Sequence, residues 1–190
     1  LFEWRSKCYC LWQWQIILSV LSDHLYNIKK ERVRRNINKF ISGGKKEMIA
    51  LGSDHGGYEL KLEIKKYLDE KGIEYKDYGC DSLESVDYPV YAKKVAHAIL
   101  DGECEKGILF CGTGIGISIT ANKIKGIRAA VCTDCFTAEA TRLHNDANIL
   151  ALGGRVVGPG LAAKIVETFL NTPFSNDERH IRRINQMETE

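Results

Sequence analysis

Prolines and tryptophans are scarce in this chain of 190 residues, and they occupy different parts of it. All three prolines follow residue 88, whereas all three tryptophans precede residue 15. Residues 1–47 carry ten Lys or Arg against four Asp or Glu, a balance of +6, and the remainder carries 17 against 21, a balance of −4. Met48 opens the second part, directly before a strand-like run. We therefore expect a domain over 48–190 and, over 1–47, an N-terminal extension outside that fold.

The sequence also lacks an apolar run long enough to cross a bilayer, which takes about 20 residues. The segment "CLWQWQIILSVL" (10–21) is interrupted by polar residues, and no small-residue cleavage site follows it. The basic segment "KKERVRRNINK" (29–39) leaves a membrane surface or a nucleic acid open as a partner of the extension alone. A net charge of +2 gives no general reason to expect nucleic acid. We expect a cytoplasmic protein with neither a membrane nor a nucleic-acid partner.

Paired cysteine motifs of the kind that bind zinc are missing as well. Seven cysteines occur, and the closest approach to such a motif is "CTDC" at 132–135. Metal sites usually need a second pair or histidines at fixed spacing, and neither follows. We therefore expect no metal, and reduced thiols.

Apolar runs alternate with helical patterns from Met48 onward. The runs are short and apolar enough to be strands buried on both faces, and several of the helical patterns open with Pro or close with Gly. This alternation predicts a parallel, doubly wound α/β sheet. The expected strands are 48–53, 73–79, 106–111, 127–132 and 147–154, and the expected helices are 58–72, 89–102, 116–126, 136–146, 159–171 and 176–187.

Ligands of such sheets bind beyond the carboxyl ends of the strands, where the segment "CGTGIG" (111–116) follows the third strand. Alternate glycines let main-chain N–H groups approach an anion. The Gly-Lys-Ser/Thr of a nucleotide P-loop is absent, because Ile117 follows Gly116. Cys111 stands where a helix N-terminus would favour a thiolate. From location alone, a small buried side chain is an equal alternative for this residue.

Three further groups are candidates, each with a structural alternative. Asp54-His55 can orient a hydroxylated ligand, or can simply cap a helix. His144-Asn145 can act on a ligand, or can terminate a helix. Arg179 and Arg183 share a helix face and suit a phosphate, although such a face is more often only solvated.

Five segments together resemble the type B ribose-5-phosphate isomerases and the related isomerases of galactose 6-phosphate and allose 6-phosphate. The resemblance covers residues 48 to about 187 and leaves residues 1–47 without a counterpart. The segments are "GSDHGGYELK", "DYPVYA", "GILFCGTGIGISITANKIKGIRAAVC", "HNDANILALGGRVVG" and "ERHIRR".

The family implies a three-layer α/β/α sandwich with a five-stranded, Rossmann-like parallel sheet, and a C-terminal helix that packs on a dimer partner. It also implies a homodimer, or alternatively a tetramer, with active sites between subunits. The implied reaction is the interconversion of ribose 5-phosphate and ribulose 5-phosphate, with no cofactor. Family members carry either a cysteine before the glycine loop or a glutamate within it as the base. Here Cys111 is present and Ile117 stands in the glutamate position, so the chain resembles the cysteine type.

The resemblance also implies roles for individual residues. Cys111 resembles the base, and Thr113 with the loop amides resembles the anion hole of the enediolate. His144 resembles the acid/base that opens the sugar ring, and His180 assists. Residues implied to bind substrate, some of them supplied by the partner subunit, are Asp54, His55, Tyr88, Gly112, Gly114, Ile115, Gly116, Asn145, Arg155, Arg179 and Arg183.

Two other functions stay open from the sequence. A hexose-6-phosphate isomerase would use the same residues with a deeper pocket. A non-catalytic sugar-phosphate-binding module would keep the glycine loop and the arginines but would not need both Cys111 and His144.

Overall fold

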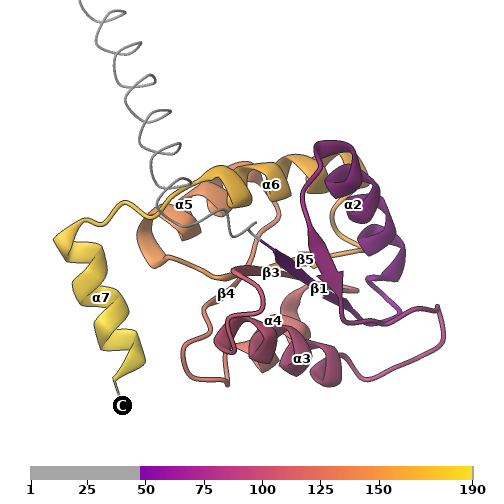
Figure 1. Cartoon of the computed structure of the whole chain (residues 1–190), viewed down its shortest axis with the longest axis horizontal. Coiled ribbons are helices and arrows are strands. Elements are labelled where there is room, and N and C mark those ends of the chain that lie inside the picture. Colours follow the sequence, from indigo (N-terminus) through magenta and orange to yellow (C-terminus); the bar gives the residue numbers. More distant parts are fainter. Residues whose placement is uncertain (1–47, 190) are drawn as a thin grey trace, which may run out of the picture. The chain divides into compact units, whose positions relative to one another are not determined.

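The computed structural model describes residues 48–189, so the prediction for residues 1–47 lies outside the described residues. Strands and helices alternate along this part of the chain (Figure 1). The strands are β1 (Ile49–Ser53), β2 (Tyr75–Asp77), β3 (Lys106–Cys111), β4 (Ala129–Val131) and β5 (Ile149–Gly153). The helices are α2 (Tyr58–Lys71), α3 (Tyr88–Leu100), α4 (Ile115–Ala121), α5 (Cys135–Asn145), α6 (Pro159–Asn171) and α7 (Glu178–Glu188).

The five strands form one parallel sheet in the order β2-β1-β3-β5-β4. This confirms the predicted five-stranded, doubly wound sheet. Strands β1, β3 and β5 are fully buried and lie at its centre. Their registers pair Ser53 with Phe110 and Cys111 with Gly153, so that these three strands end side by side.

Helices cover both faces of the sheet, which confirms the predicted three layers (Figure 1). Alternate residues of each central strand face opposite layers. In β3, Phe110 packs in the core with α2, α5 and α6, whereas Leu109 and Cys111 pack in the core with α3 and α4. Each fully buried Leu, Ile or Phe side chain contributes roughly 1.5–3 kcal/mol to these cores.

Helix α4 is shorter than predicted, and the residue that follows it contacts β4. Asn122 follows the helix, and its side-chain amide pairs with the main chain of Ala129, accepting from N at 2.7 Å and donating to O at 2.8 Å. The two hydrogen bonds fix Asn122 to Ala129, the first residue of β4. Gly126 then turns the chain with a φ of 85°.

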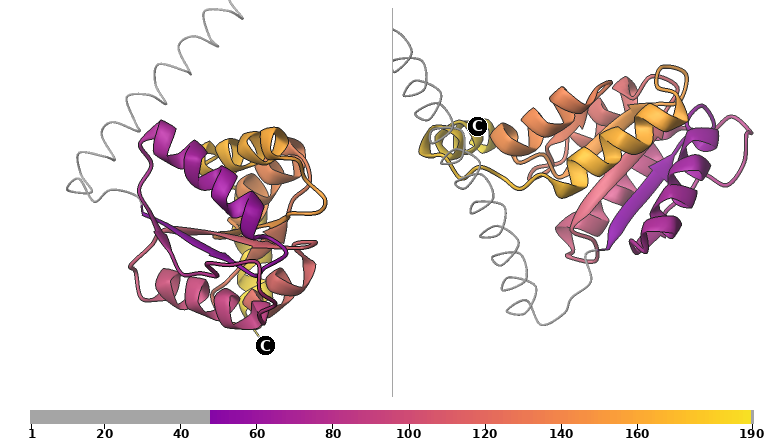
Figure 2. Two further views of the ribbon diagram at one scale, coloured as in Figure 1. Left: turned by 90° about the vertical axis from the view of Figure 1, so that its right-hand side faces the viewer. Right: turned by 90° about the horizontal axis from the view of Figure 1, so that it is seen from above.

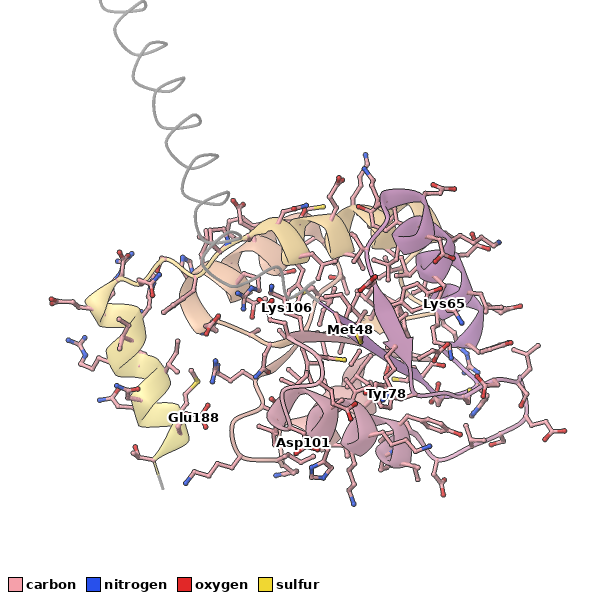
Figure 3. All side chains as sticks on the ribbon, in the orientation of Figure 1. Met48, Lys65, Tyr78, Asp101, Lys106 and Glu188 are labelled. Carbon is pink, nitrogen blue, oxygen red and sulfur yellow. The ribbon has the colours of Figure 1, made fainter. Side chains whose placement is uncertain are left out.

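Helix α7 lies beyond the amino ends of the strands, away from the edge where β1 and β2 end (Figures 1 and 2). It is joined to the domain through its one buried residue, His180, and through Glu188. Glu188, labelled at the end of α7 in Figure 3, accepts a hydrogen bond from Arg128 Nη1 at 2.8 Å. The predicted packing of this helix on a second subunit stays a prediction.

A buried lysine joins α2 to the sheet. Lys61 is fully buried, and its Nζ donates to Asp77 Oδ1 at 2.9 Å and to the Cys80 carbonyl at 2.5 Å. Lys65 donates to the other Asp77 oxygen at 2.8 Å. Burial opposes ionisation of this carboxyl, but Lys65, Lys61 and the Gly79 N–H outweigh it and hold the pKa of Asp77 below its usual range.

We expect Lys61→Met to lower the free energy of unfolding by about 1–3 kcal/mol, because it removes a buried charge partner that Lys65 replaces only in part. Because the pKa of Asp77 is lowered by folding, its stabilisation is complete above the ordinary carboxyl pKa. It is lost as the pH falls through the folded value, so the difference from the native chain should shrink in acid. Urea unfolding at several pH values measures both effects.

Lys66→Met is the matched control. The Lys66–Glu63 ion pair is exposed, so its loss should change stability by less than about 0.5 kcal/mol. Equal effects of the two substitutions would contradict the structural role of Lys61.

Candidate active site

Three loops meet at the carboxyl edge of the sheet, after β1, β3 and β5. A hydrogen bond from Gly154 N to Cys111 O at 2.8 Å joins two of them, and one from Arg155 N to Gly112 O at 3.0 Å joins them again. This is the edge at which the sequence predicted a ligand site.

The loops touch main chain to main chain, which requires glycine. A Cβ on Gly57 would lie 2.4 Å from the carbonyl carbon of Phe110 and 2.6 Å from the nitrogen of Cys111. A Cβ on Gly154 would lie 2.7 Å from the carbonyl oxygen of Gly56. Atoms cannot approach so closely, because optimal carbon contacts are about 3.5–4.0 Å. The glycines that follow β1 and β5 therefore allow these loops to close around the end of β3.

Cys111 ends β3 and is 4% exposed. The Gly114 N–H donates to its Sγ at 3.0 Å. Gly114 has a φ of 80°, which turns the loop back toward the sulfur. A main-chain hydrogen-bond donor therefore points at the sulfur from within the loop.

Two residues of the glycine loop are open to the surface. Thr113 and Ile115 are exposed, and the Ile115 N–H donates to Thr113 Oγ1 at 3.3 Å. The phenol of Tyr88, from the first turn of α3, lies against the loop, since a Cβ on Gly116 would stand 2.8 Å from Tyr88 Cζ. Tyr88 thus lies beside the loop, and its predicted contact with substrate stays a prediction.

The Arg155 side chain lies along the glycine loop. A Cβ on Gly112 would lie 3.6 Å from Arg155 Cδ and 3.7 Å from its Nε. Arg155 is exposed, and within residues 48–189 it forms no ion pair. An exposed guanidinium beside Gly112 suits an anionic group of a ligand.

Asp54 and His55 complete this half of the site. Asp54 is 6% exposed, and its Oδ1 accepts from Gly57 N at 3.0 Å, which shapes the turn after β1. His55 is half-buried, and its Nδ1 accepts from the Val86 N–H at 3.2 Å.

His144 and Asn145 lie at the opposite edge of the sheet within one chain. They end α5, which runs back from the carboxyl end of β4, so its 11 residues carry them about 15 Å away. The Asn145 carbonyl accepts at 2.9 Å from Arg128, which precedes β4. The structure therefore does not bring His144 and Asn145 together with Asp54 and Tyr88 in a single subunit.

Arg179 and Arg183 belong to this second group. They lie on α7 and are exposed, and Arg179 pairs loosely with Asp177 at 3.5 Å. His180, between them, is packed with its ring centroid 4.6 Å from that of His144. Burial lowers the pKa of His180, and neighbouring Arg179 lowers it further. One chain thus carries two separate sets of predicted site residues.

The described residues hold no group of three or more His, Cys, Asp or Glu side chains that could bind a metal. In the same part of the chain, no helix combines the length and apolar character needed to span a membrane. Cys132, from the "CTDC" segment, is buried, and this burial raises its pKa to about 11.

Two contributors to the carboxyl edge of the sheet were not among the predicted site residues. Lys61 sits three residues before Ile64 and shares the buried face of α2, a spacing that could have marked it as buried. Val86 acts through its main chain, which leaves no signal in residue type.

Comparisons with known proteins agree with this architecture. A family model described as Ribose/Galactose Isomerase matches residues 49–187. Ribose-5-phosphate isomerase B of Escherichia coli is 51% identical over 136 residues, which cover 72% of this chain and 91% of that protein.

Two solved structures show the same fold. Ribose-5-phosphate isomerase B of Clostridium thermocellum matches with a TM-score of 0.73 and 55% identity, covering 74% of this chain and 95% of that one. A ribose 5-phosphate isomerase from Thermotoga maritima matches with a TM-score of 0.73 and 54% identity, covering 75% of this chain and 97% of that one.

We expect Gly57→Ala to lower the free energy of unfolding by about 1–3 kcal/mol or more, because the new methyl would overlap the main chain of Phe110 and Cys111. Gly160→Ala is the control, since a Cβ on this residue of the first turn of α6 would meet no atom within 4 Å. There, alanine should be neutral or stabilising by up to about 1 kcal/mol. Thermal unfolding compares the two variants, and a tolerated Gly57→Ala would refute the close contact.

Proposed function

This chain belongs to the ribose/galactose isomerase family, and we propose that it interconverts ribose 5-phosphate and ribulose 5-phosphate through an enediolate. It is a sugar-phosphate isomerase of the ribose-5-phosphate isomerase B type. The observation that carries the proposal is the 3.0 Å hydrogen bond from the Gly114 N–H to Cys111 Sγ inside the glycine loop.

Cys111 is proposed as the base. In the open-chain aldose, the proton on C2 is acidified by the neighbouring C1 carbonyl. A thiolate removes it, and the electron pair passes through the new C1–C2 double bond to the carbonyl oxygen. Return of the proton to C1, with transfer of a proton from O2 to O1, yields the ketose. Atoms and electrons balance within the sugar, so the step uses no external oxidant.

The glycine loop is proposed to stabilise the charge on oxygen. The proposed donors are the main-chain N–H groups over Gly112–Gly116 and the Thr113 hydroxyl, which need no cation. In the free protein, two of these N–H groups already donate within the loop, that of Gly114 to Cys111 Sγ and that of Ile115 to Thr113 Oγ1.

Opening of the sugar ring is proposed for His144 of a second copy of this chain. Within one subunit His144 and Cys111 lie at opposite edges of the sheet. The distance between these edges is about the length of β5, whose five residues span about 13 Å. A homodimer that brings the α5 end of one copy to the glycine loop of the other would unite them. Asp54, Tyr88 and Asn145 would then bind sugar hydroxyls from both subunits.

The phosphate is proposed to lie between the two copies. Arg155 and His55 come from the subunit that supplies Cys111, and Arg179 and Arg183 come with α7 of the other. The exposure of all three arginines supports this arrangement, because their guanidinium groups are open to a phosphate. The alternative substrates are hexose 6-phosphates such as allose or galactose 6-phosphate; the named relatives at 51–55% identity favour the pentose.

Cys111→Ala should lower kcat for ribose 5-phosphate about 10²–10⁴-fold, the usual contribution of a general base, while a phosphate-bearing competitive ligand still binds. The measurement is a coupled or polarimetric assay of ribulose 5-phosphate together with calorimetric binding. Unchanged turnover would refute the assignment of the base.

The native chain should also be assayed against allose 6-phosphate and galactose 6-phosphate at equal concentration. Faster turnover of either hexose phosphate would replace the proposed substrate. Binding of sugar phosphates without turnover of any of them would favour the non-catalytic module.

Co-expression of a Cys111→Ala chain with a His144→Ala chain should restore about a quarter of native activity. Half of randomly assembled dimers are mixed, and each mixed dimer has one of its two sites free of both substitutions. If both residues instead served one site within one chain, every site would be defective and no activity would return.

The control co-expresses native chain with the doubly substituted Cys111→Ala, His144→Ala chain. If the sites are shared between copies, both sites of a mixed dimer are defective, and only the native dimers, about a quarter of the total, are active. If each site lies within one chain, every native chain is active, which gives about half of native activity.

A further inference from the structure

The segment between β2 and α3, residues 78–87, is held to the active-site turn at both of its ends. At its start, Ser53 N donates to Gly79 O at 2.6 Å and Cys80 N donates to Ser53 O at 2.8 Å. The buried Lys61 ammonium also donates to the Cys80 carbonyl. Near its end, the Val86 N–H donates to His55 Nδ1 at 3.2 Å. Between these ends, residues 81–85 are exposed.

The bond to His55 determines which of its ring nitrogens carries a proton. A ring nitrogen accepts a hydrogen bond only through a free lone pair, so Nδ1 is unprotonated while the Val86 N–H points at it. The single proton of the neutral ring is then on Nε2. The far side of the ring, which faces away from the 78–87 segment, is therefore a hydrogen-bond donor and not an acceptor.

We propose that the main-chain N–H of Val86 is a positioning group that holds His55 as the Nε2–H tautomer, so that His55 donates a hydrogen bond to the phosphorylated substrate. The Nε2–H tautomer is a property of the free protein, whereas the donated hydrogen bond rests on the proposed function, which supplies a sugar phosphate as the acceptor.

A donor is the form that an anionic substrate requires. The phosphate and the sugar oxygens present lone pairs, and an imidazole lone pair directed at them would be repelled. In the other tautomer, Nε2 would point a lone pair at the substrate. Because the proton is already on Nε2 in the free protein, substrate binding does not have to move it there from Nδ1, which lowers the cost of binding.

The arrangement links the buried core to the substrate. Lys61 and Asp77 anchor the start of the segment, whose later residues bring the Val86 amide to His55. The Val86 side chain has no part in this bond, so among the common residues only proline removes the donor.

Nitrogen-15 spectra of the histidine rings in the full chain, without substrate, test the tautomer directly. The chain has five histidines, and the His55 signals are identified by their loss in His55→Asn. We expect a proton-bearing Nε2 and an unprotonated Nδ1 at neutral pH. A proton on Nδ1, or a mixture of tautomers, would overturn the proposal whatever the substrate proves to be.

Val86→Pro should convert the His55 signals to a mixture of tautomers, and Val86→Ala, which keeps the N–H, should leave the native pattern. Ser85→Pro controls for proline in the same segment, because it leaves the Val86 N–H in place. A native tautomer in a folded Val86→Pro chain would refute the role of this amide.

Kinetics test the donor without altering the segment, and they remain informative if Val86→Pro fails to fold. Glutamine at position 55 can place an N–H₂ near the position of Nε2, whereas asparagine can place only its acceptor near that of Nδ1. His55→Gln should therefore keep a kcat/KM about tenfold higher than His55→Asn, with the difference mainly in KM, because a phosphate contact binds ground and transition states alike. Equal or better function of His55→Asn would overturn the donor role, while the spectra would still decide the tautomer.

Discussion

Close contact between main chains at the carboxyl edge of the sheet is the constraint on which the site depends. Gly57 lies against the end of β3 and Gly154 lies against Gly56, at distances that exclude any side chain. These contacts bring the turn after β1 and the turn after β5 to the two sides of Cys111. The glycine loop can then direct the Gly114 N–H at the sulfur. Without this packing, the same residues would lie on three separate loops.

A second constraint is the direction of α5. In a parallel sheet each connecting helix returns to the amino edge, so residues at the end of such a helix are removed from the ligand edge by the length of a strand. The amino edge, away from the ligand edge, is where one chain carries His144, Asn145 and the arginines of α7. The division of one chain into two sets of polar residues is the physical reason for proposing a site shared by two copies.

The buried charge of Lys61 anchors the segment that contacts His55 at the carboxyl edge of the sheet. Lys61 spans Asp77 and the Cys80 carbonyl, and the segment that begins there ends at the His55 ring. The core and the site are therefore connected through hydrogen bonds to main-chain atoms. Such bonds do not depend on the side chains, so residues 81–85 can be exposed while both ends of their segment stay in place.

The alternation of apolar runs and helical patterns was sufficient to predict five parallel strands and the edge that carries Cys111, Asp54 and Arg155, because periodicity and burial are local properties of the chain. The three layers were implied by the resemblance to a known family. The ends of α4 and β4 were not predictable, since Asn122 and Ala129 meet only after folding. Sequence alone thus determined the fold class and the types of chemical group available. Only the tertiary structure decided which groups share an edge and which tautomer of His55 is favoured, because both depend on distances between main-chain atoms far apart in the sequence.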